Sequence, residues 1–321
     1  MNIIFLRGAV PPAKEHPEKL KYNDIKNCED MWTQLFYYIA KWMEAKAEVL
    51  YSGKNRIAFV DDNFSEKWVN FQKYSPSFKP DLIVCRGGFD YYLDFIKRFK
   101  HTKKVYYGAG KRFYPLGYDK YDLFFVDSPI QRNYILKKKK NVSLFIKPAA
   151  TIFAPVKCEK KYDVCFVANA SQRIIKRHDL LINAVNKLGL KTMIIGNTDR
   201  SLINKHKNIH WTGWLLRKHL PALISSCKVA VCCSSNYDSC PRVIPEYLAC
   251  NLPVVVTSNV NFWKSEYITE QTGLCVSEKK LSNGIHQCLK GSWSPRSYYK
   301  KHLSMNTAVD LWINEIAKLF R

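Results

Sequence analysis

The chain has 321 residues, 47% hydrophobic and 24% charged, and this composition excludes an intrinsically disordered protein. Its length predicts two domains of about 150 residues each. Lys and Arg number 51 against 27 Asp and Glu, which gives a formal net charge of +24. Such an excess predicts attraction to polyanions: nucleic acid, acidic lipid or phosphorylated sugar. The alternative explanation is an AT-rich genome, which enriches Lys, Asn and Ile together.

Neither a leader nor a membrane span is expected. Residues 1–6 are apolar, but Arg7 ends this run well short of a signal-peptide core. No run approaches the 18 apolar residues that a spanning helix needs. The 11 cysteines are odd in number and lack paired C-x-x-C spacing, so we expect free thiols, buried at Cys165, Cys232 and Cys233, and a cytoplasmic location.

Short apolar runs alternate with stretches of helical period along the whole chain. The first half predicts strands at residues 3–6, 56–60, 81–85, 104–107 and 122–126, and helices at 30–49 and 91–99. The second half predicts strands at residues 162–167, 192–195, 229–233 and 253–257, and helices at 179–188 and 219–225. Buried strands separated by helices are typical of βαβ units and parallel sheets.

A break at residues 148–161, where prolines and charges interrupt the periodicity, separates two sets of strands. We therefore predict an α/β fold of two doubly wound, Rossmann-like domains, at residues 1–150 and 151–300. Residues 301–321 form a C-terminal segment with a helix from about residue 307. Ligands of such sheets bind at the carboxyl ends of the strands, so the predicted site is the cleft that two such domains face.

Two common nucleotide-binding motifs are missing. No Gly-x-Gly-x-x-Gly follows the first strand, which argues against a dehydrogenase. No Gly-x-x-x-x-Gly-Lys-Ser/Thr is present, which argues against a P-loop enzyme.

The most informative stretch is residues 229–276. A strand opens into the polar loop at residues 234–240, a helix begins near Pro241 and carries Glu246, and a turn leads into the next strand. Loop N–H groups and a helix N-terminus form an anion site suited to a diphosphate. A carboxylate on the first turn of that helix can accept hydrogen bonds from sugar hydroxyls.

The order of motifs in this stretch resembles the donor half of a GT-B glycosyltransferase, closest to glycosyltransferase family 4. The family's Glu-x7-Glu corresponds to Asp238-x7-Glu246, and its following strand entry to residues 248–255, Leu-Ala-Cys-Asn-Leu-Pro-Val-Val. Residues 272–276, Thr-Gly-Leu-Cys-Val, resemble its Thr-Gly-Leu-Leu-Val. Ile-Ile-Gly-Asn, with Gly196, and His-Trp-Thr-Gly-Trp, ending at Trp214, resemble its nucleotide-side loops.

The resemblance implies a role for each matching residue. Glu246 would hold ribose hydroxyls, Asp238 would contact hydroxyls of the transferred sugar, and Ser239 with Cys240 would meet the phosphates. Gly196 and Trp214 would lie beside the nucleotide. The donor would be a nucleotide-diphosphate sugar, with UDP favoured, and no cofactor or metal is expected.

The family also neutralises the departing diphosphate with an Arg and a Lys. Lys176 falls on the Lys position, but Ser171 occupies the Arg position, so Arg173 or Arg177 must supply that charge. Preorganised cations stabilise the charge that a departing diphosphate accumulates. No Asp-x-Asp metal motif is present, and the likeness favours retention of anomeric configuration.

Simpler explanations exist for each of these residues. Glu246 can be a solvated carboxylate that stabilises its helix dipole, and Asp238 can be a helix cap. Lys176 and Arg173 can be surface cations, and Trp214 can pack in the core.

The first domain departs further from the family. Arg-Gly-Ala-Val-Pro replaces the usual Gly-Gly loop after the first strand, and the family's His is not found near residues 107–110. Arg86, Lys111 and Arg112 at strand ends are the acceptor-binding candidates. Asp90 follows two glycines and is the candidate base for an acceptor hydroxyl, with helix capping as the alternative.

The charge excess is unevenly distributed. Residues 1–96 contain 13 cations and 13 anions, whereas residues 97–147 contain 14 Lys and Arg against 3 Asp and Glu. Aromatic residues accompany these cations at Tyr106, Tyr107, Phe113 and Tyr114, as on nucleic-acid surfaces. The alternative is a solvated face with a basic loop at residues 137–140.

Three functions remain open at this point. The leading hypothesis is a transferase that adds a sugar to a hydroxymethylated base in DNA, which must leave the stack to react. The second is an envelope glycan, lipopolysaccharide or lipid glycosyltransferase that binds an anionic membrane peripherally. The third is a non-catalytic nucleic-acid-binding protein on a degenerate GT-B fold.

Overall fold

The computed structural model describes residues 1–7, 25, 28–53, 56–61, 63–87, 90–108, 117–138, 140–197 and 207–321. The chain divides into two compact units. The first unit consists of residues 1–145 and 308–321, and the second of residues 146–307. The C-terminal residues therefore belong to the same unit as the N-terminal residues.

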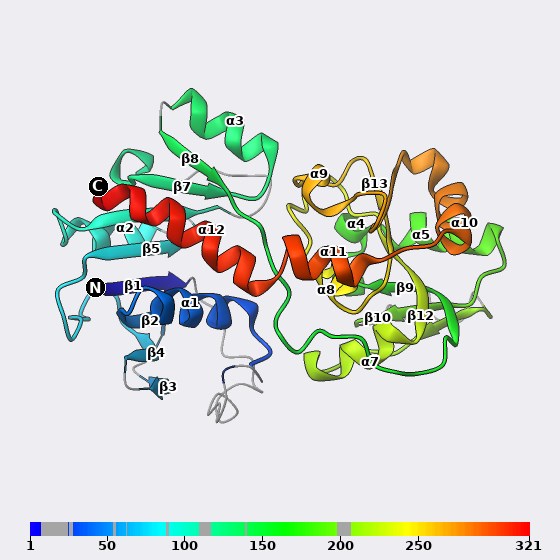
Figure 1. The fold of residues 1–321 in the computed structure, drawn as a ribbon, viewed down its shortest axis with the longest axis horizontal. Coiled ribbons are helices and arrows are strands. Elements are labelled where there is room, and N and C mark those ends of the chain that lie inside the picture. The colour runs from blue at the N-terminus through cyan, green and yellow to red at the C-terminus, as the bar shows by residue number, and fades with distance from the viewer. Residues whose placement is uncertain are drawn as a thin grey trace. The chain divides into compact units, whose positions relative to one another are not determined.

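The first unit is built on an eight-stranded sheet in the order β3-β4-β2-β1-β5-β6-β7-β8 (Figure 1). Its strands are β1 (Asn2–Arg7), β2 (Lys46–Ser52), β3 (Arg56–Asp61), β4 (Phe64–Val69), β5 (Leu82–Arg86), β6 (Lys103–Tyr107), β7 (Leu123–Val126) and β8 (Asn141–Leu144). All pairs are parallel except the pair of β3 and β4. The expectation of a wholly parallel sheet was wrong for this edge, because β3 returns to β4 as a hairpin.

The described part of the first unit contains the helices α1 (Met31–Trp42), α2 (Asp90–Lys97) and α3 (Pro129–Lys137), and, from residue 308 on, most of α12 (Met305–Ala317). The first turn of α1 is capped by Asp30, which accepts hydrogen bonds from the backbone N–H groups of Trp32 and Thr33. Aromatic stacking joins helices to the sheet, with Phe36 on Phe5 and Trp312 on Phe125, both at 4.2 Å between ring centroids.

The predicted helix at residues 30–49 proved wrong beyond Trp42. Helix α1 ends there, Glu44 adopts a left-handed φ of 47°, and β2 begins at Lys46. Residues 46–49 pair in parallel with β1, so sheet pairing decided the structure of a stretch whose apolar spacing also fits a helix.

The second unit contains a six-stranded, wholly parallel sheet in the order β11-β10-β9-β12-β13-β14. Its strands are β9 (Tyr162–Val167), β10 (Thr192–Ile195), β11 (Ile209–Trp211), β12 (Cys227–Cys232), β13 (Val254–Thr257) and β14 (Gly273–Val276). Its helices are α4 (Arg173–Lys176), α5 (His178–Lys187), α7 (Leu220–Ser225), α8 (Val243–Ala249), α9 (Lys264–Tyr267), α10 (Leu281–Lys290) and α11 (Pro295–His302).

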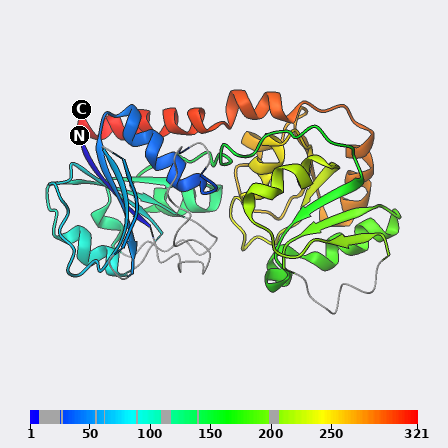
Figure 2. The ribbon, with the colours of Figure 1, turned by 90° about the horizontal axis from the view of Figure 1, so that it is seen from below.

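Short 3₁₀ turns complete both units. They are η2 (Tyr118–Lys120), η3 (Ala170–Gln172), η4 (Arg217–His219), η5 (Glu278–Lys280) and η6 (Lys318–Phe320). In the second unit, helices lie on both faces of the sheet, as in a doubly wound fold (Figure 2).

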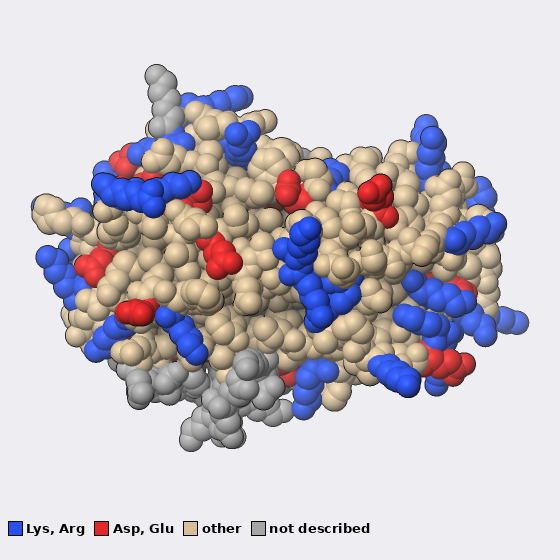
Figure 3. All heavy atoms as spheres, in the orientation of Figure 1, with Lys and Arg blue, Asp and Glu red and all other residues tan. Residues whose placement is uncertain are grey.

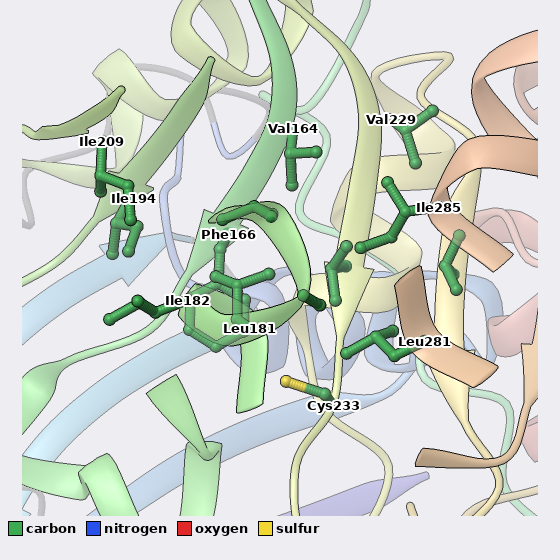
Figure 4. Packing of buried hydrophobic residues seen from close by; sticks show 14 of the residues in the cluster. Val164, Phe166, Leu181, Ile182, Ile194, Ile209, Val229, Cys233, Leu281 and Ile285 are labelled. Atoms are coloured by element: carbon green, nitrogen blue, oxygen red, sulfur yellow. The ribbon is translucent and has the colours of Figure 1, made fainter. Parts of the chain in front are cut away.

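The core of the second unit forms where α5 and α10 cover the central strands (Figure 4). Val164, Phe166 and Ile194 of the sheet pack with Leu181 of α5 and Ile285 of α10, each at most 2% exposed. Burial on both faces explains why these strands read as continuous apolar runs in the sequence. The core therefore fixes the strand ends that carry the polar loops described below.

All eleven cysteines are free, and Cys165, Cys232 and Cys233 are buried, as expected. Within the described ranges, no helix is long and apolar enough to cross a bilayer.

A buried histidine makes the stability of the second unit depend on pH. His178 is fully buried between Phe166 and Trp211, with Nε2 3.4 Å from the Ala168 carbonyl oxygen, and burial lowers the pKa of its imidazole. As pH falls below about 6.5, the unfolded chain binds a proton before the folded chain does. We expect the free energy of unfolding to fall with pH down to the lowered pKa.

Urea unfolding between pH 7.5 and 5 measures this slope. The His178→Phe variant should have a shallower slope than the unchanged chain. A His286→Phe variant serves as the control on α10. If the free energy of unfolding depended equally on pH in the unchanged chain and in His178→Phe, His178 would not be the source of this pH dependence.

Candidate active site

The loops that follow the parallel strands of the second unit meet at one edge of the sheet, because parallel strands end on the same side. The loop after β12 joins the segment after β9 through the Ser235 N–H, which donates to the Ile175 carbonyl at 2.7 Å. The loops after β10 and β11 are joined by the Gly196 N–H, which donates to the Gly213 carbonyl at 3.1 Å. Most of the residues expected at the donor site lie on these connected loops.

Lys176 and Asp238 form an ion pair at this edge. Lys176 Nζ lies 2.5 Å from Asp238 Oδ2, and the two side chains are 18% and 17% exposed. Asp238 does not cap α8, which begins at Val243 and has Arg242 at its N-cap without a side-chain hydrogen bond. A lysine and a carboxylate 62 residues apart in the sequence are thus held together and remain accessible to a ligand.

Glu246 lies on α8 and is only 3% exposed, so it is not a solvated helix-dipole carboxylate. Its Oε1 accepts a hydrogen bond from Arg217 Nη2, and this ion pair is part-buried. The guanidinium of Arg217 in turn lies 5.2 Å from the centre of the Phe153 ring. A buried carboxylate with a partly exposed cationic partner is suited to exchange that partner for a polar ligand.

The loop between Asp238 and α8 is held by backbone contacts. Ser239 forms an isolated parallel bridge with Asn261, and the Cys240 N–H donates to the Asn261 carbonyl at 3.0 Å. Cys240 has a left-handed φ of 43°, and its carbonyl accepts from Lys147 Nζ at 2.6 Å. The Cys240 N–H is therefore not available to a phosphate, contrary to the simplest version of the sequence-based expectation.

The thiols at the end of β12 and directly after it are buried and have raised pKa values. Burial raises the pKa of Cys232 to about 11, with a further contribution from the Asp238 charge. Burial also raises the pKa of Cys233, whose Sγ lies 3.6 Å from the Lys176 carbonyl. Both therefore remain neutral thiols near neutral pH.

The two arginines beside Lys176 have carboxylate partners. Arg173 Nε donates to Asp179 Oδ2 at 2.8 Å, and these side chains are 35% and 57% exposed. Arg177, which has a left-handed φ of 61° between α4 and α5, makes a two-point ion pair with Glu278, in which Nη2 lies 2.7 Å from Oε2. Arg173 is thus the more accessible of the two, and Arg177 joins α5 to the η5 turn.

Gly196 and Trp214 lie on adjoining loops. Trp214 follows Gly213 and is 49% exposed, so it does not belong to the core. Gly196 has φ 145°, and a Cβ atom there would lie 2.3 Å from the Ala168 carbonyl oxygen. Only glycine lets the loop after β10 approach the loop after β9 this closely.

We therefore expect Gly196→Ala to push these two loops apart. The free energy of unfolding should fall by roughly 2 kcal/mol, because the new methyl group meets backbone that cannot move aside cheaply. Thermal unfolding measures this loss. Gly189→Ala is the control, because its Cβ would meet nothing within 4 Å although its φ is also positive. Equal losses in the two variants would contradict the steric explanation.

In the first unit, Arg86 lies at the carboxyl end of β5 and is paired in register with Arg7 of β1. The Arg86 guanidinium lies 4.6 Å from the centre of the Trp32 ring. Arg7 is buried and donates to Tyr51 Oη at 2.8 Å and to Asp30 Oδ2 at 2.9 Å. The two adjacent arginines therefore differ in exposure. Arg7 is buried and paired with Asp30, whereas Arg86 is half-buried and keeps part of its surface open to solvent.

The other first-domain candidates are described only in part. Asp90 is the first residue of α2 itself, and its side chain lies outside what the structure describes, so its expected roles as base or as helix cap stay predictions. Lys111 and Arg112 lie outside the described residues, as do Phe113 and Tyr114.

The basic segment at residues 97–147 is partly internal. Lys104 is 8% exposed and donates to the carbonyls of Phe99 and Thr102, and burial lowers its pKa. Arg98 donates to the Phe71 and Tyr74 carbonyls, and Lys147 to Cys240 as described above. Some of the charge excess therefore satisfies backbone carbonyls of this chain.

The aromatic residues that accompany these cations are also internal where they are described. Tyr106 is 3% exposed and Tyr107 is fully buried, with Tyr107 Oη donating to Asp127 Oδ2 at 2.8 Å. The expectation that they interleave with cations on a nucleic-acid surface was wrong, because both lie on a central strand of the sheet.

Sequence reasoning missed Arg217 and Lys147 as members of the site. Arg217 follows the His-Trp-Thr-Gly-Trp motif by three residues, but no spacing rule connects it with a glutamate 29 residues further on. Lys147 was counted as part of the basic segment, and only the fold reveals its contact with the loop at Cys240. Within the described part of the chain, no group of three or more His, Cys, Asp or Glu side chains could hold a metal ion.

Comparison with known proteins finds a family similar to part of the second unit. The family described as "Glycosyl transferases group 1" matches residues 161–291, which span β9 to β14. No curated protein sequence matches the chain.

Solved structures match both units together. Sucrose-phosphate synthase from Thermosynechococcus elongatus is 13% identical, with a TM-score of 0.77 over 100% of this chain and 99% of its own. Anabaena HepE in complex with UDP and glucose is 12% identical, with a TM-score of 0.69 over 99% and 100%. The lipopolysaccharide outer core galactosyltransferase WaaB is 11% identical, with a TM-score of 0.66 over 99% of both chains. These likenesses confirm the predicted two-domain α/β fold class.

Proposed function

We propose that the chain, whose residues 161–291 match the family of group 1 glycosyl transferases, is a nucleotide-sugar-dependent glycosyltransferase that transfers its sugar to an anionic envelope glycan or glycolipid. The transferase class rests on the domain and the fold. The acceptor class rests on the charges of the first unit.

The paired arrangement of two cations and two carboxylates supports the donor proposal. In the proposed donor complex, ribose hydroxyls donate to Glu246 and replace the hydrogen bond from Arg217. Hydroxyls of the transferred sugar donate to Asp238. Arg217, released from Glu246 and resting on Phe153, remains beside the nucleotide as a positioning residue.

Lys176 supplies positive charge for the departing nucleoside diphosphate in this proposal. A diphosphate that enters next to the Lys176–Asp238 pair attracts the ammonium group and leaves Asp238 for the sugar. Charge stabilisation by a preorganised group in a low-dielectric site is a large catalytic effect. Arg173 remains a weaker candidate for a second cation, because it already holds Asp179.

For the remaining donor-side residues, only their location and exposure support the proposed roles. Gly196 allows the close approach of two loops, half-exposed Trp214 is proposed to contact the nucleobase, and Ser239, 8% exposed, is proposed to meet the phosphates. Retention of configuration and UDP as the nucleotide stay predictions from the resemblance.

On the acceptor side, Arg86 is the cation that the proposal assigns to an anionic acceptor. The observation that favours a glycan or glycolipid over DNA is the burial of Tyr106 and Tyr107, which removes two of the four aromatic residues behind the DNA hypothesis. Asp90 remains the proposed base for the acceptor hydroxyl.

The experiment incubates the full chain with radiolabelled UDP-glucose, UDP-galactose or UDP-N-acetylglucosamine. Parallel tubes contain a phosphorylated lipopolysaccharide core, a lipid extract or hydroxymethylated DNA. We expect label in one of the first two acceptors, and label in DNA alone would overturn the acceptor proposal. Release of UDP without any labelled acceptor would leave the donor proposal standing and reject all three acceptors.

A further inference from the structure

The exposed cations of the basic segment gather around α3 together with exposed aliphatic side chains. Ile130 and Leu136 of α3 are large aliphatic residues that are 47% and 44% exposed. Arg132, Lys137 and Lys138 are exposed on the same helix and its C-cap. Lys138 Nζ lies 5.2 Å from the ring centre of Tyr118, which is itself 36% exposed. These six residues define the α3 surface.

The geometry of α3 turns these residues outward. Gln131 and Ile135 are fully buried against the sheet, so at 100° per residue the opposite side of the helix carries Ile130, Leu136 and Lys137. Arg132 flanks this side. Helix α3 covers β7 and β8 at one end of the sheet order (Figure 1).

Negative charge is nearly absent here. The sequence of α3, Pro-Ile-Gln-Arg-Asn-Tyr-Ile-Leu-Lys, contains no Asp or Glu. The η2 turn, which carries Tyr118, contains one exposed carboxylate, Asp119, and this carboxylate forms an ion pair with Lys120 Nζ at 2.7 Å. In Figure 3, Lys and Arg side chains project at the upper edge of the view, where Figure 1 places α3.

We propose that the α3 surface docks the protein on an anionic lipid bilayer. Cations beside exposed aliphatic side chains match the two layers of such a surface: phosphate-bearing headgroups and the acyl boundary beneath them. A nucleic-acid backbone would pair with the cations but would offer nothing to Ile130 and Leu136. This docking is independent of the donor chemistry and adds a partner to the proposed function.

Vesicle binding by the full chain tests the proposal. We expect binding to phosphatidylcholine vesicles with about one third phosphatidylserine, little binding to phosphatidylcholine alone, and weakening by salt. The Lys137→Ala, Lys138→Ala double variant should bind the anionic vesicles roughly 30-fold more weakly. Its matched control is Lys300→Ala, Lys301→Ala on α11, which removes the same charge from exposed positions of the second unit.

A second variant separates a bilayer from nucleic acid. Ile130→Ser, Leu136→Ser should also weaken vesicle binding, while its binding to a duplex DNA fragment should equal that of the unchanged chain. Absence of vesicle binding, an equal loss in the α11 control, or a serine variant with undiminished vesicle binding would overturn the proposal. UDP release from the UDP-sugar without vesicles should be the same in all variants, so failure of docking and failure of the transferase proposal are distinguishable.

Discussion

Replacing Glu246 by Gln should lower kcat/KM for the nucleotide sugar by roughly 100-fold, mainly through KM. The change removes hydrogen bonds to a charged acceptor, each worth about 1.5–3 kcal/mol, and leaves Arg217 without its carboxylate. UDP release at varied concentrations of UDP-sugar measures both constants. The loss should appear with every sugar in the panel, because the proposed contact is with the ribose.

Glu270→Gln is the control for this variant, since Glu270 is an exposed glutamate of the same unit. It makes the same chemical change away from the strand ends of β9 and β12. Unchanged KM in Glu246→Gln would remove Glu246 from the donor site. Equal loss in both variants would mean that the assay responds to charge in general.

Replacing Lys176 by Ala should lower kcat by roughly 100-fold, with a smaller change in KM. The ammonium group is proposed to stabilise the negative charge that develops as the diphosphate departs. Removal of one group that stabilises transition-state charge typically lowers kcat by roughly 10²–10³-fold. The loss of its partner also leaves Asp238 unpaired at 17% exposure. Single-turnover measurements with saturating UDP-sugar separate the chemical step from binding.

Lys187→Ala is the matched control, because Lys187 is an exposed lysine at the end of α5. The double variant Lys176→Ala, Asp238→Asn distinguishes the two roles of the pair. It should be no more active than Lys176→Ala alone, because Asp238 contacts the sugar itself. Recovery of kcat in the double variant would mean that Lys176 serves only to neutralise Asp238.

Where burial dominates, the sequence predicted local structure closely. The strands at residues 162–167 and 192–195 appear with the predicted bounds as β9 and β10, because both are covered on two faces and read as unbroken apolar runs. Strands β2, β4, β8, β11 and β14 were missed. Strand β2 shares its apolar spacing with a helix and pairs with β1 at the start of the chain. Strand β8 is only partly buried, so it lacks a continuous apolar run.

For the site, the sequence identified the carboxylates and the lysine but not the contacts they make. The spacing of Asp238 and Glu246 is local, so a motif can carry it. The pairing of Lys176 with Asp238 and of Arg217 with Glu246 depends on how loops after separate strands meet at the sheet edge. The placement of residues 308–321 in the first unit likewise comes from tertiary packing of Trp312 on Phe125.

The location of the donor site on the loops after β9, β11 and β12 is the central claim, and amide hydrogen exchange of the full chain with and without UDP tests it most directly. UDP should slow exchange in residues 168–177, 211–217 and 234–246, while β2 and β4 of the first unit stay unchanged. Protection confined to the first unit, or none in these loops at saturating UDP, would contradict the account.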